Sequence, residues 1–448
     1  MHLFAANEMQ QTTSNTHTTD RLHAPKRTGN RPAESDSAGA CSCRFHGGLG
    51  KKRQNVAAPS HDHQENKGYE AKKARQNRRR ERYADQRTAA AIYTSQTAPG
   101  SKSAGRGVTL CGWTQIADQE TRLVRVDEAA GPRAFYRGLV SCGLRWVCPC
   151  CTIKKSEESR EALNAALSVA REKGLRPVLL TLTARHKRSW GLRQFWDALS
   201  LAEKRMKTRR AWKGLNDRMP GGFAKAVELT HGRNGWHPHF HLVLMLEAGE
   251  GEGIELVESL RDEWLHQLNL VGLDGLSDAA RKRAFDVRGA DQAGDYITKW
   301  GAAEEMTLAE KKVGKSDGRN PWQLLRDART AETEAERMKA GALWWQAVQV
   351  MSGVHQLRQS PKFRELVAEY EPPEEPGEKT PEVEVFSFGN AKFDRTWSHV
   401  RNKRLLMREA AEKGSIEGAG QAVADAMMGD MLDIDLWRDD IDIGPLIE

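Results

Sequence analysis

The chain has 448 residues, a length that predicts two or three folded units together with tails. Hydrophobic residues make up 39% and charged residues 29%, so a core of ordinary composition shares the chain with polar sequence. No apolar run approaches the ~18 residues of a membrane span, and residues 3–6 are too few for the apolar part of a secretory signal. We therefore expect a cytoplasmic protein that does not cross a membrane.

The first 106 residues carry a net charge of +10 and are rich in serine, threonine, glutamine, asparagine and glycine. Because this segment has almost no apolar periodicity, we predict a disordered basic arm over residues 1–106. Contact with a polyanion is its expected use, and a solubilising tail without a partner is the alternative. The residues expected to contact DNA form its basic cluster: Lys72, Lys73, Arg78, Arg79 and Arg80.

Residues 107–153 are predicted to form a cysteine-rich zinc-binding segment. Four of the seven cysteines follow the spacing C-x30-C-x5-C-x2-C: Cys111, Cys142, Cys148 and Cys151. A two-residue gap lets both thiolates of a C-x-x-C step face one tetrahedral ion at ~2.3 Å, and Gly112 and Gly143 suit the tight turns around it. Since protein fills all four positions, the Zn²⁺ would be structural. Buried reduced thiols, or Cys150 in the place of Cys148, are the alternatives.

The pattern of residues 154–302 predicts one domain of mixed structure. The expected helices are residues 154–173, 192–210, 254–270 and 291–300, and the expected strands are residues 176–183, 223–230, 238–246 and 283–288. Residues 231–238 are predicted to form a hairpin loop. The order β-α-β-β-α-β-α predicts an α+β fold in which helices back an antiparallel sheet, similar to a ferredoxin-like arrangement.

Histidines alternate along the strand that follows this hairpin loop. Because side chains alternate along a strand, His239 and His241 project to one face, and the predicted loop puts Glu228 directly opposite His241. Two imidazoles and a carboxylate suit Mn²⁺, Co²⁺, Zn²⁺ or Mg²⁺ and leave positions open for a phosphate oxygen. His231 and His237 are further candidates, and a polar strand face without a ligand is the alternative.

The next element carries Tyr296 and Lys299, which are three residues apart and so share one face of the expected helix. A phenol beside an ammonium group and a metal-polarised phosphate can act as a nucleophile, because nearby positive charge favours the phenolate. The product would be a phosphotyrosine ester. An ordinary, half-exposed helical pair is the alternative.

Two segments complete the chain. Residues 303–370 are predicted to form a helical extension, with helices at residues 322–328 and 333–351 in which Trp344 and Trp345 pack. Residues 371–448 carry a net charge of −9 and open with a stretch rich in proline and glutamate. This composition predicts an acidic linker and a disordered tail.

Three motifs resemble those of the rolling-circle plasmid replication initiators of the HUH endonuclease superfamily. They are T-L-T at Thr181–Thr183, H-P-H-F-H at His237–His241 and Y-I-T-K-W at Tyr296–Trp300, in this order and after the cysteine cluster. The resemblance covers roughly residues 110–351. It implies that residues 154–302 are a nicking domain that cuts one strand of a plasmid's double-strand origin.

The resemblance also implies roles for individual residues. His239 and His241 match metal ligands, with Mg²⁺ or Mn²⁺ as the expected ion, whereas Glu228 as a third ligand rests on the strand register above. Tyr296 matches the nucleophile that stays bound to the 5′ end while the freed 3′-hydroxyl primes synthesis. Lys299 matches a helper on the same helix face.

One position departs from the family pattern. Related one-tyrosine initiators are expected to carry an acid about one turn before the tyrosine to help termination, and Gln292 occupies that position here. Asp291 and Asp295 are the nearby carboxylates and so the candidates for this role. Water or a second protomer are the other ways to end the cycle.

The expected partner is plasmid origin DNA, single-stranded or extruded as a hairpin, because a duplex would hold the scissile phosphate away from a recessed site. Trp236 and Trp300 are candidates to stack on its bases. The sequence has no G-x-x-x-x-G-K-[ST] phosphate loop, so host helicase and polymerase are expected partners. A relaxase or transposase with the same chemistry, and a non-enzymatic zinc-containing DNA-binding protein, are the alternative functions.

Overall fold

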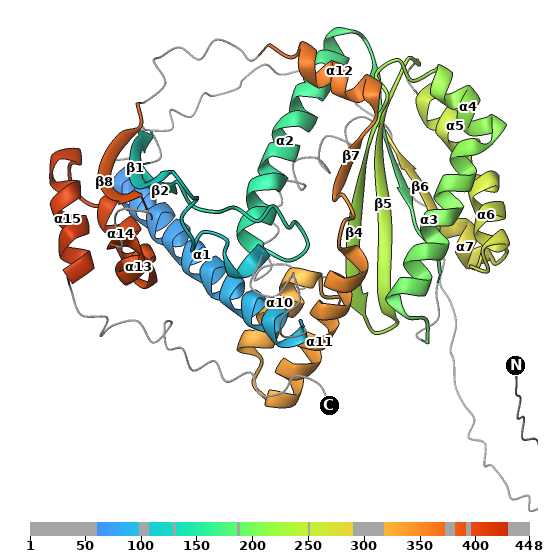
Figure 1. The fold of residues 1–448 in the computed structure, drawn as a ribbon. Coiled ribbons are helices and arrows are strands. Elements are labelled where there is room, and N and C mark those ends of the chain that lie inside the picture. Colours follow the sequence, from blue (N-terminus) through green and yellow to red (C-terminus); the bar gives the residue numbers. More distant parts are fainter. Residues whose placement is uncertain are drawn as a thin grey trace, which may run out of the picture. The chain divides into compact units, whose positions relative to one another are not determined.

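Two antiparallel sheets and their surrounding helices make up the computed structural model of the protein (Figure 1). The structure describes residues 61–97, 107–128, 131–185, 189–249, 251–289, 318–371, 381–390 and 396–428, all within the unit Pro59–Glu448. The predicted α+β class is therefore confirmed. None of the helices in these ranges combines the length and the apolar composition needed to cross a bilayer.

The larger sheet has five strands in the order β6-β3-β5-β4-β7, and every neighbouring pair is antiparallel. Its strands are β3 (Arg176–Leu182), β4 (Phe223–Gly232), β5 (Gly235–Leu246), β6 (Phe285–Arg288) and β7 (Leu357–Gln359). The first four match the predicted strands in place and order. The edge strand β7 was not predicted, because three residues are too few for a periodic pattern.

Helices cover both faces of this sheet (Figure 1). On one face lie α3 (Leu192–Thr208), α4 (Arg210–Asp217), α5 (Glu252–Glu258), α6 (Arg261–Leu270) and α7 (Asp278–Arg283); α2 (Pro149–Glu172) and α12 (Pro361–Glu369) lie on the other. Strand β5 shows the division, since Leu242 and Leu244 pack into the first layer and Val243 and Met245 into the second. Nearer the hairpin, histidines occupy the face of Val243.

Two further helices follow the sequence prediction closely. Helices α10 (Pro321–Thr330) and α11 (Glu334–Met351) each begin with a capping box, formed by Asn320 and Thr333 respectively. Trp344 is fully buried, and Trp345 packs edge-to-face on Tyr93 of helix α1 (His61–Gln96), with ring centroids 5.7 Å apart. The single helix expected at residues 254–270 is instead divided into α5 and α6.

The smaller sheet corrects the prediction for the C-terminal segment. Its strands, in the order β2-β1-β8, are β1 (Glu120–Glu128), β2 (Gly131–Arg137) and β8 (Val383–Asn390), and α13 (Thr396–Val400), α14 (Arg404–Ala411) and α15 (Ile416–Met428) follow. Leu123, Phe388, Trp397 and Met407 share its core. Residues 383–390 and 396–428 are therefore folded rather than an acidic tail, because β8 finds its apolar partners on β1. Residues 429–448 lie outside the described ranges.

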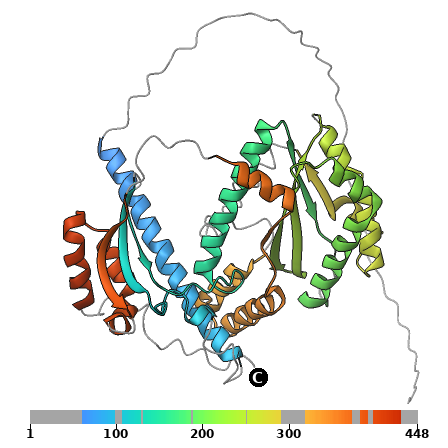
Figure 2. The same cartoon turned by 45° about the horizontal axis from the view of Figure 1, so that its top comes forward.

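Helix α1 corrects the prediction of a disordered arm for residues 61–96, while residues 1–60 lie outside the described ranges. It runs along the smaller sheet (Figure 2). Arg79 forms a buried ion pair with Glu412 at 2.7 Å, and Arg80 pairs with Glu409 at 2.6 Å. The basic residues of one end of the chain are thus neutralised by acidic residues of the other, which makes ordered packing possible.

We expect Glu412→Gln to lower the free energy of unfolding by about 3–5 kcal/mol, because it leaves the buried Arg79 without its counter-charge. Burial raises the pKa of Glu412, but the hydrogen bond and charge of Arg79 outweigh this and lower it. The contribution of Glu412 to the free energy of unfolding is therefore fully present above the ordinary carboxyl pKa. It is lost as the pH falls through the lowered pKa of the folded protein. Urea titrations at neutral and acidic pH measure both effects.

Glu384→Gln is the matched control for this prediction. It breaks the exposed pair of Arg122 and Glu384, whose atoms are 3.5 Å apart. Exposed ion pairs contribute about 0–1 kcal/mol to the free energy of unfolding, so the midpoint of the urea titration should hardly change. Equal losses in the free energy of unfolding for the two substitutions would show that the buried pair stabilises the fold no more than the exposed one.

Candidate functional site

A row of three histidines lies on one face of β5: His237, His239 and His241. The ring centroids of His237 and His239 are 4.1 Å apart, and those of His239 and His241 are 6.0 Å apart and stacked. Threonines of the T-L-T motif contact this row from β3 and its end. Thr181 Oγ1 lies 3.0 Å from His241 Nδ1, and Thr183 Oγ1 lies 3.0 Å from His237 Nε2. These two hydroxyl groups orient the outer imidazoles.

The register of the hairpin differs from the prediction by two residues. Gly232 pairs with Gly235, so the connection is a two-residue turn and not a loop over residues 231–238. Glu228 consequently lies opposite His239 instead of His241. The reason is local: Gly235 adopts a φ of 91°, which lets the chain reverse early and extends β5 toward the turn.

Glu228 nevertheless contacts His241. Its Oε2 atom lies 2.9 Å from His241 Nε2, because residues on diagonal positions of neighbouring strands share a face. His241 itself is 8% exposed, and the residue directly opposite it is the small Ala226. The structure thus brings together the two histidines and the carboxylate that the sequence indicated. By donor type, two imidazoles and a carboxylate are the kind of ligands that the sequence indicated for Mn²⁺, Co²⁺, Zn²⁺ or Mg²⁺.

A basic groove of about 980 Å³ adjoins the row at the hairpin end of the sheet. His237, Thr183 and Thr230 lie on its wall. The charged residues that line it are Arg185, Arg233, Asp278, Lys282 and Arg283. Four cations against one carboxylate make this groove attractive to a phosphate chain.

Residues 290–317 lie outside the described residues. The predicted catalytic residues Asp291, Asp295, Tyr296 and Lys299, together with Gln292 and Trp300, fall in this segment. Its two flanks are described. Arg288 ends β6 opposite Leu179, and Gly318 lies on the wall of the basic groove against Gly232.

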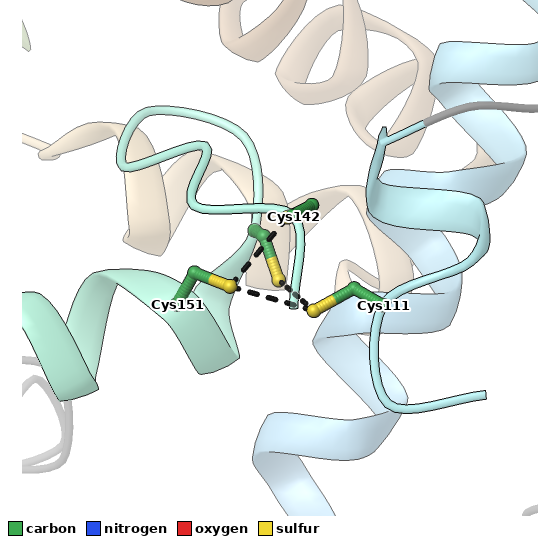
Figure 3. Close-up of side chains that lie close together, drawn as sticks. Cys111, Cys142 and Cys151 are labelled. Carbon is green, nitrogen blue, oxygen red and sulfur yellow. Dashed lines mark hydrogen bonds between the residues drawn. The ribbon is translucent and has the colours of Figure 1, made fainter. Parts of the chain in front are cut away.

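The predicted zinc ligands form the second candidate site, and Figure 3 shows three of them, Cys111, Cys142 and Cys151. The sulfur atoms of Cys111, Cys142, Cys148 and Cys151 all lie within 4.8 Å of one another, and all four cysteines are free thiols. Cys151 Sγ is 3.4 Å from Cys111 Sγ and 3.5 Å from Cys142 Sγ. Four sulfurs at ~2.3 Å around a tetrahedral ion are ~3.8 Å apart, so the cluster is close to the size of a zinc site. Cys150 lies outside the cluster.

Local structure explains why the four thiols converge. Gly112 and Gly143 adopt φ values of 63° and 67°, the turn conformation expected after Cys111 and Cys142. Cys148 caps α2 and Cys151 lies in its first turn, where the helix dipole favours thiolates. Hydrogen bonds from the other three thiols, that of Cys111 first, lower the pKa of Cys151 well below its usual range.

Helix α1 closes the cluster through Gln86. Its side-chain amide donates to the carbonyl oxygen of Cys111 at 2.7 Å and lies 3.9 Å from Cys148 Sγ. Cys150 instead donates to Gln86 Oε1 at 3.5 Å. The structure therefore separates Cys150 from the four clustered thiols, and Cys148 occupies the position for which the sequence left two alternatives.

Two groups of predicted DNA contacts need correction. Trp236 is 4% exposed and donates from Nε1 to Gln346 of α11, so its ring packs in the core and cannot stack on a base. Arg79 is equally buried, and Arg80 is held by Glu409. The Nζ atom of Lys72 donates to the backbone oxygen of Glu412 at 3.0 Å.

Lys73 and Arg78 are exposed on α1 and stay predicted DNA contacts. Sequence reasoning missed the contacts of Thr181 and Thr183 with the histidines. The sequence contained the information needed to predict these contacts, since two threonines at alternate positions of a strand share one face. Asp286 of β6 was also missed; it lies in one row with Thr181 and His241 across the sheet.

Comparison with known proteins shows what part of the chain is similar to. Residues 137–264 match the model of a protein family described as "Replication protein". This segment contains α2, β3, the histidine row and three of the four clustered cysteines. The resemblance to replication initiators drawn from the motifs is thereby confirmed for this part of the chain.

Two curated relatives extend the match. "Protein rep" of Streptomyces lividans is 27% identical over 278 residues, which cover 50% of this chain and 61% of the relative. "Neomycin resistance protein" of Streptomyces cyanogenus is 29% identical over 162 residues, which cover 30% of this chain and 37% of the relative. The chain thus spans less than two thirds of either relative. No solved structure matches it.

Proposed function

We propose that this protein is a plasmid rolling-circle replication initiator that nicks and rejoins one strand of its origin DNA. One observation carries the proposal. The histidine row with Glu228 lies within the segment that matches replication proteins, and it adjoins a basic groove. The β-α-β-β-α-β order of the larger sheet supports an HUH-type, ferredoxin-like nicking domain.

The proposed reaction is a transesterification. The phenolate oxygen of Tyr296 attacks the scissile phosphorus, the bond from phosphorus to the 3′-oxygen breaks, and the 3′-oxygen takes up a proton. The 5′ end stays on the protein as a phosphotyrosine, so the energy of the broken ester is kept for rejoining. Lys299 offsets charge on the transition state. Asp291 or Asp295 is the proposed group for the terminating step in place of the acid that Gln292 replaces.

His239, His241 and Glu228 would hold a divalent ion, Mg²⁺ or Mn²⁺, which neutralises charge on the scissile phosphate when bound. Thr181 keeps Nδ1 of His241 occupied, so Nε2 points to the side where Glu228 lies. This hydrogen bond holds the ring in its orientation, as outer partners of metal ligands do.

Chain connectivity allows Tyr296 to reach this row. Tyr296 follows Arg288 by eight residues, and an extended segment of that length spans up to about 28 Å. Strands β6 and β5 are only two strand spacings apart, about 10 Å. The histidine row therefore lies well within reach of the phenol.

The remaining roles follow from this proposal. The cluster of Cys111, Cys142, Cys148 and Cys151 would hold a structural Zn²⁺. The substrate would be a single strand or an extruded hairpin of the plasmid origin, and host helicase and polymerase would continue replication in the cytoplasm. Trp300 is the proposed stacking residue now that Trp236 is buried.

We expect His239→Ala and His241→Ala to make cleavage of single-stranded origin DNA insensitive to Mn²⁺ or Mg²⁺. Cleavage should fall by more than about 100-fold, since loss of the outer partners of a metal site alone reduces activity or metal affinity about 10- to 100-fold. Gel assays across a metal titration measure this. His266→Ala, on the exposed side of α6, is the matched control and should cleave as the wild type. Normal metal-dependent nicking by the β5 variants would exclude both residues as ligands.

A further inference from the structure

A second cationic groove, which we call the β7 groove, lies at the edge of the larger sheet. Its volume is about 1610 Å³, and residues of α2, α3, β4, β7 and α12 line it. Seven lysine or arginine residues belong to its lining against two glutamates. A groove of this charge needs an anionic ligand to balance it, and it lies apart from the basic groove at the hairpin.

The floor of the β7 groove already contains more positive than negative charge. Glu203, 6% exposed, binds Lys207 through one oxygen at 2.6 Å and Lys225 through the other at 2.7 Å. Burial first, and then the charges of Lys225 and Arg358, lower the pKa of Lys207 against the opposing effect of Glu203. One carboxylate thus serves two half-buried ammonium groups, and a bound anion would offset the excess charge.

Three further cations of the lining are exposed: Lys204 on α3, Arg358 on β7 and Arg364 on α12. Within the described ranges, no carboxylate forms an ion pair with any of them. They come from three different elements that converge at the sheet edge. Cations that converge without intramolecular partners are typical of a surface that binds a phosphate backbone.

The sheet connects this groove to the histidine row. Leu357 of β7 pairs with Ala226 of β4, which in turn pairs with His241 of β5. Two strand spacings, about 10 Å, therefore separate Leu357 from the row. Lys225 and Arg358 pair with each other at the adjacent positions, so they project to the opposite face of the sheet from the histidines. A DNA chain in the groove would therefore pass around the β7 edge to reach the histidines.

We propose that the β7 groove binds the phosphodiester backbone of the DNA that flanks the nick site. This inference rests on the proposed nicking function and adds a holding site for the flank. The half-buried Lys207 and Lys225 form its floor, and Lys204, Arg358 and Arg364 contact successive phosphates. The groove would fix the register of the strand without reading bases, since phosphate contacts position the nucleic acid and carry no sequence information.

The test compares two triple variants with equal loss of charge. One carries K204Q, R358Q and R364Q; the control carries R171Q, R176Q and K413Q, which are exposed and outside the groove lining. Binding of origin DNA with its flank is measured by fluorescence anisotropy over a salt series. We expect the groove variant to lose about 2.7 from the slope of log K against log salt if the flank is duplex, and about 2.1 if it is single-stranded. The control should keep the wild-type slope, and both variants should unfold at the wild-type temperature.

Equal slopes for the two variants would overturn the proposal. An RNA of the same sequence that binds the wild type as tightly, and loses the same slope in the groove variant, would overturn the assignment to DNA. A short oligonucleotide that spans only the nick site separates this question from catalysis. The groove variant should form the covalent adduct with it at the wild-type rate. Absence of any adduct from the wild type would refute the nicking function itself.

Discussion

Tyr296→Phe should abolish the covalent protein–DNA adduct while leaving origin binding intact. The substitution removes only the oxygen that would attack phosphorus, so cleavage should fall on the order of 10⁴-fold or more, the scale seen when the nucleophile of a covalent enzyme is removed. Incubation with labelled single-stranded origin DNA and Mn²⁺, followed by denaturing gel electrophoresis, detects the adduct. Anisotropy with the same DNA measures binding.

Two other tyrosines serve as matched controls. Tyr93 packs against Trp345, and Tyr370 is half-buried at the end of α12. Neither lies in the Y-I-T-K-W motif, so Tyr93→Phe and Tyr370→Phe should form the adduct at the wild-type yield. An undiminished adduct in Tyr296→Phe would remove this residue from the mechanism and direct attention to another nucleophile.

Cys148→Ser should release the zinc and destabilise the fold around it. Structural zinc contributes on the order of 10 kcal/mol in small zinc-binding peptides, so loss of one thiolate removes a large share of the local stability. Cys148 is fully buried at the start of α2, where a serine hydroxyl is a far weaker ligand. Metal analysis of the purified protein should give about one equivalent of zinc for the wild type. The variant should hold less than half of that and unfold at a lower temperature.

Cys150→Ser is the control that separates zinc binding from thiol chemistry in general. Cys150 neighbours two members of the cluster in sequence, yet its thiol donates to Gln86 and lies outside the four. Its substitution should leave the zinc content unchanged. Full zinc occupancy in Cys148→Ser would show that this thiol is not a ligand.

The features predicted from sequence with success have local signals. The C-x-x-C step spans only Cys148–Cys151, Gly112 and Gly143 each directly follow a cysteine, and both glycines adopt the expected turn conformation. The histidines alternate along a single strand, so their common face followed from the period of a strand alone. The order of the four strands was equally readable from apolar periodicity, whereas the short helices α4 and α7 were not predicted.

The register of β4 against β5 depends on the length of the hairpin turn, which the alternation of side chains in the sequence does not define. The hairpin reverses over two residues because Gly235 adopts a positive φ, and this moved Glu228 from the position opposite His241 to a diagonal one. Long side chains tolerate such a shift, since diagonal neighbours remain within contact distance. The metal-site hypothesis therefore keeps the same three residues although the pairing beneath it was wrong.

The packing of α1 and the C-terminal helices on the smaller sheet could not be predicted, because the residues that contact one another there are far apart in the chain. Arg79 and Glu412 are 333 positions apart, and each lies in a segment whose composition alone indicates disorder. Opposite net charges at the two ends were visible in the sequence, but which charges pair was not. The pair also depends on a third segment, since the backbone N–H of Ala134 on β2 donates to Glu412 Oε1 at 2.9 Å.

The pairing of β1 with β8 sets an order of events during synthesis. Val124 pairs with Glu384, so at 5–20 residues per second the ribosome needs roughly 13 to 52 seconds between making one partner and the other. Strands β3, β4, β5 and β6 have all been made by residue 288. The nascent protein would thus complete the four-stranded part of its histidine-bearing sheet first, while Arg79 and Arg80 of α1 wait for Glu412 and Glu409, which are among the last residues to be made.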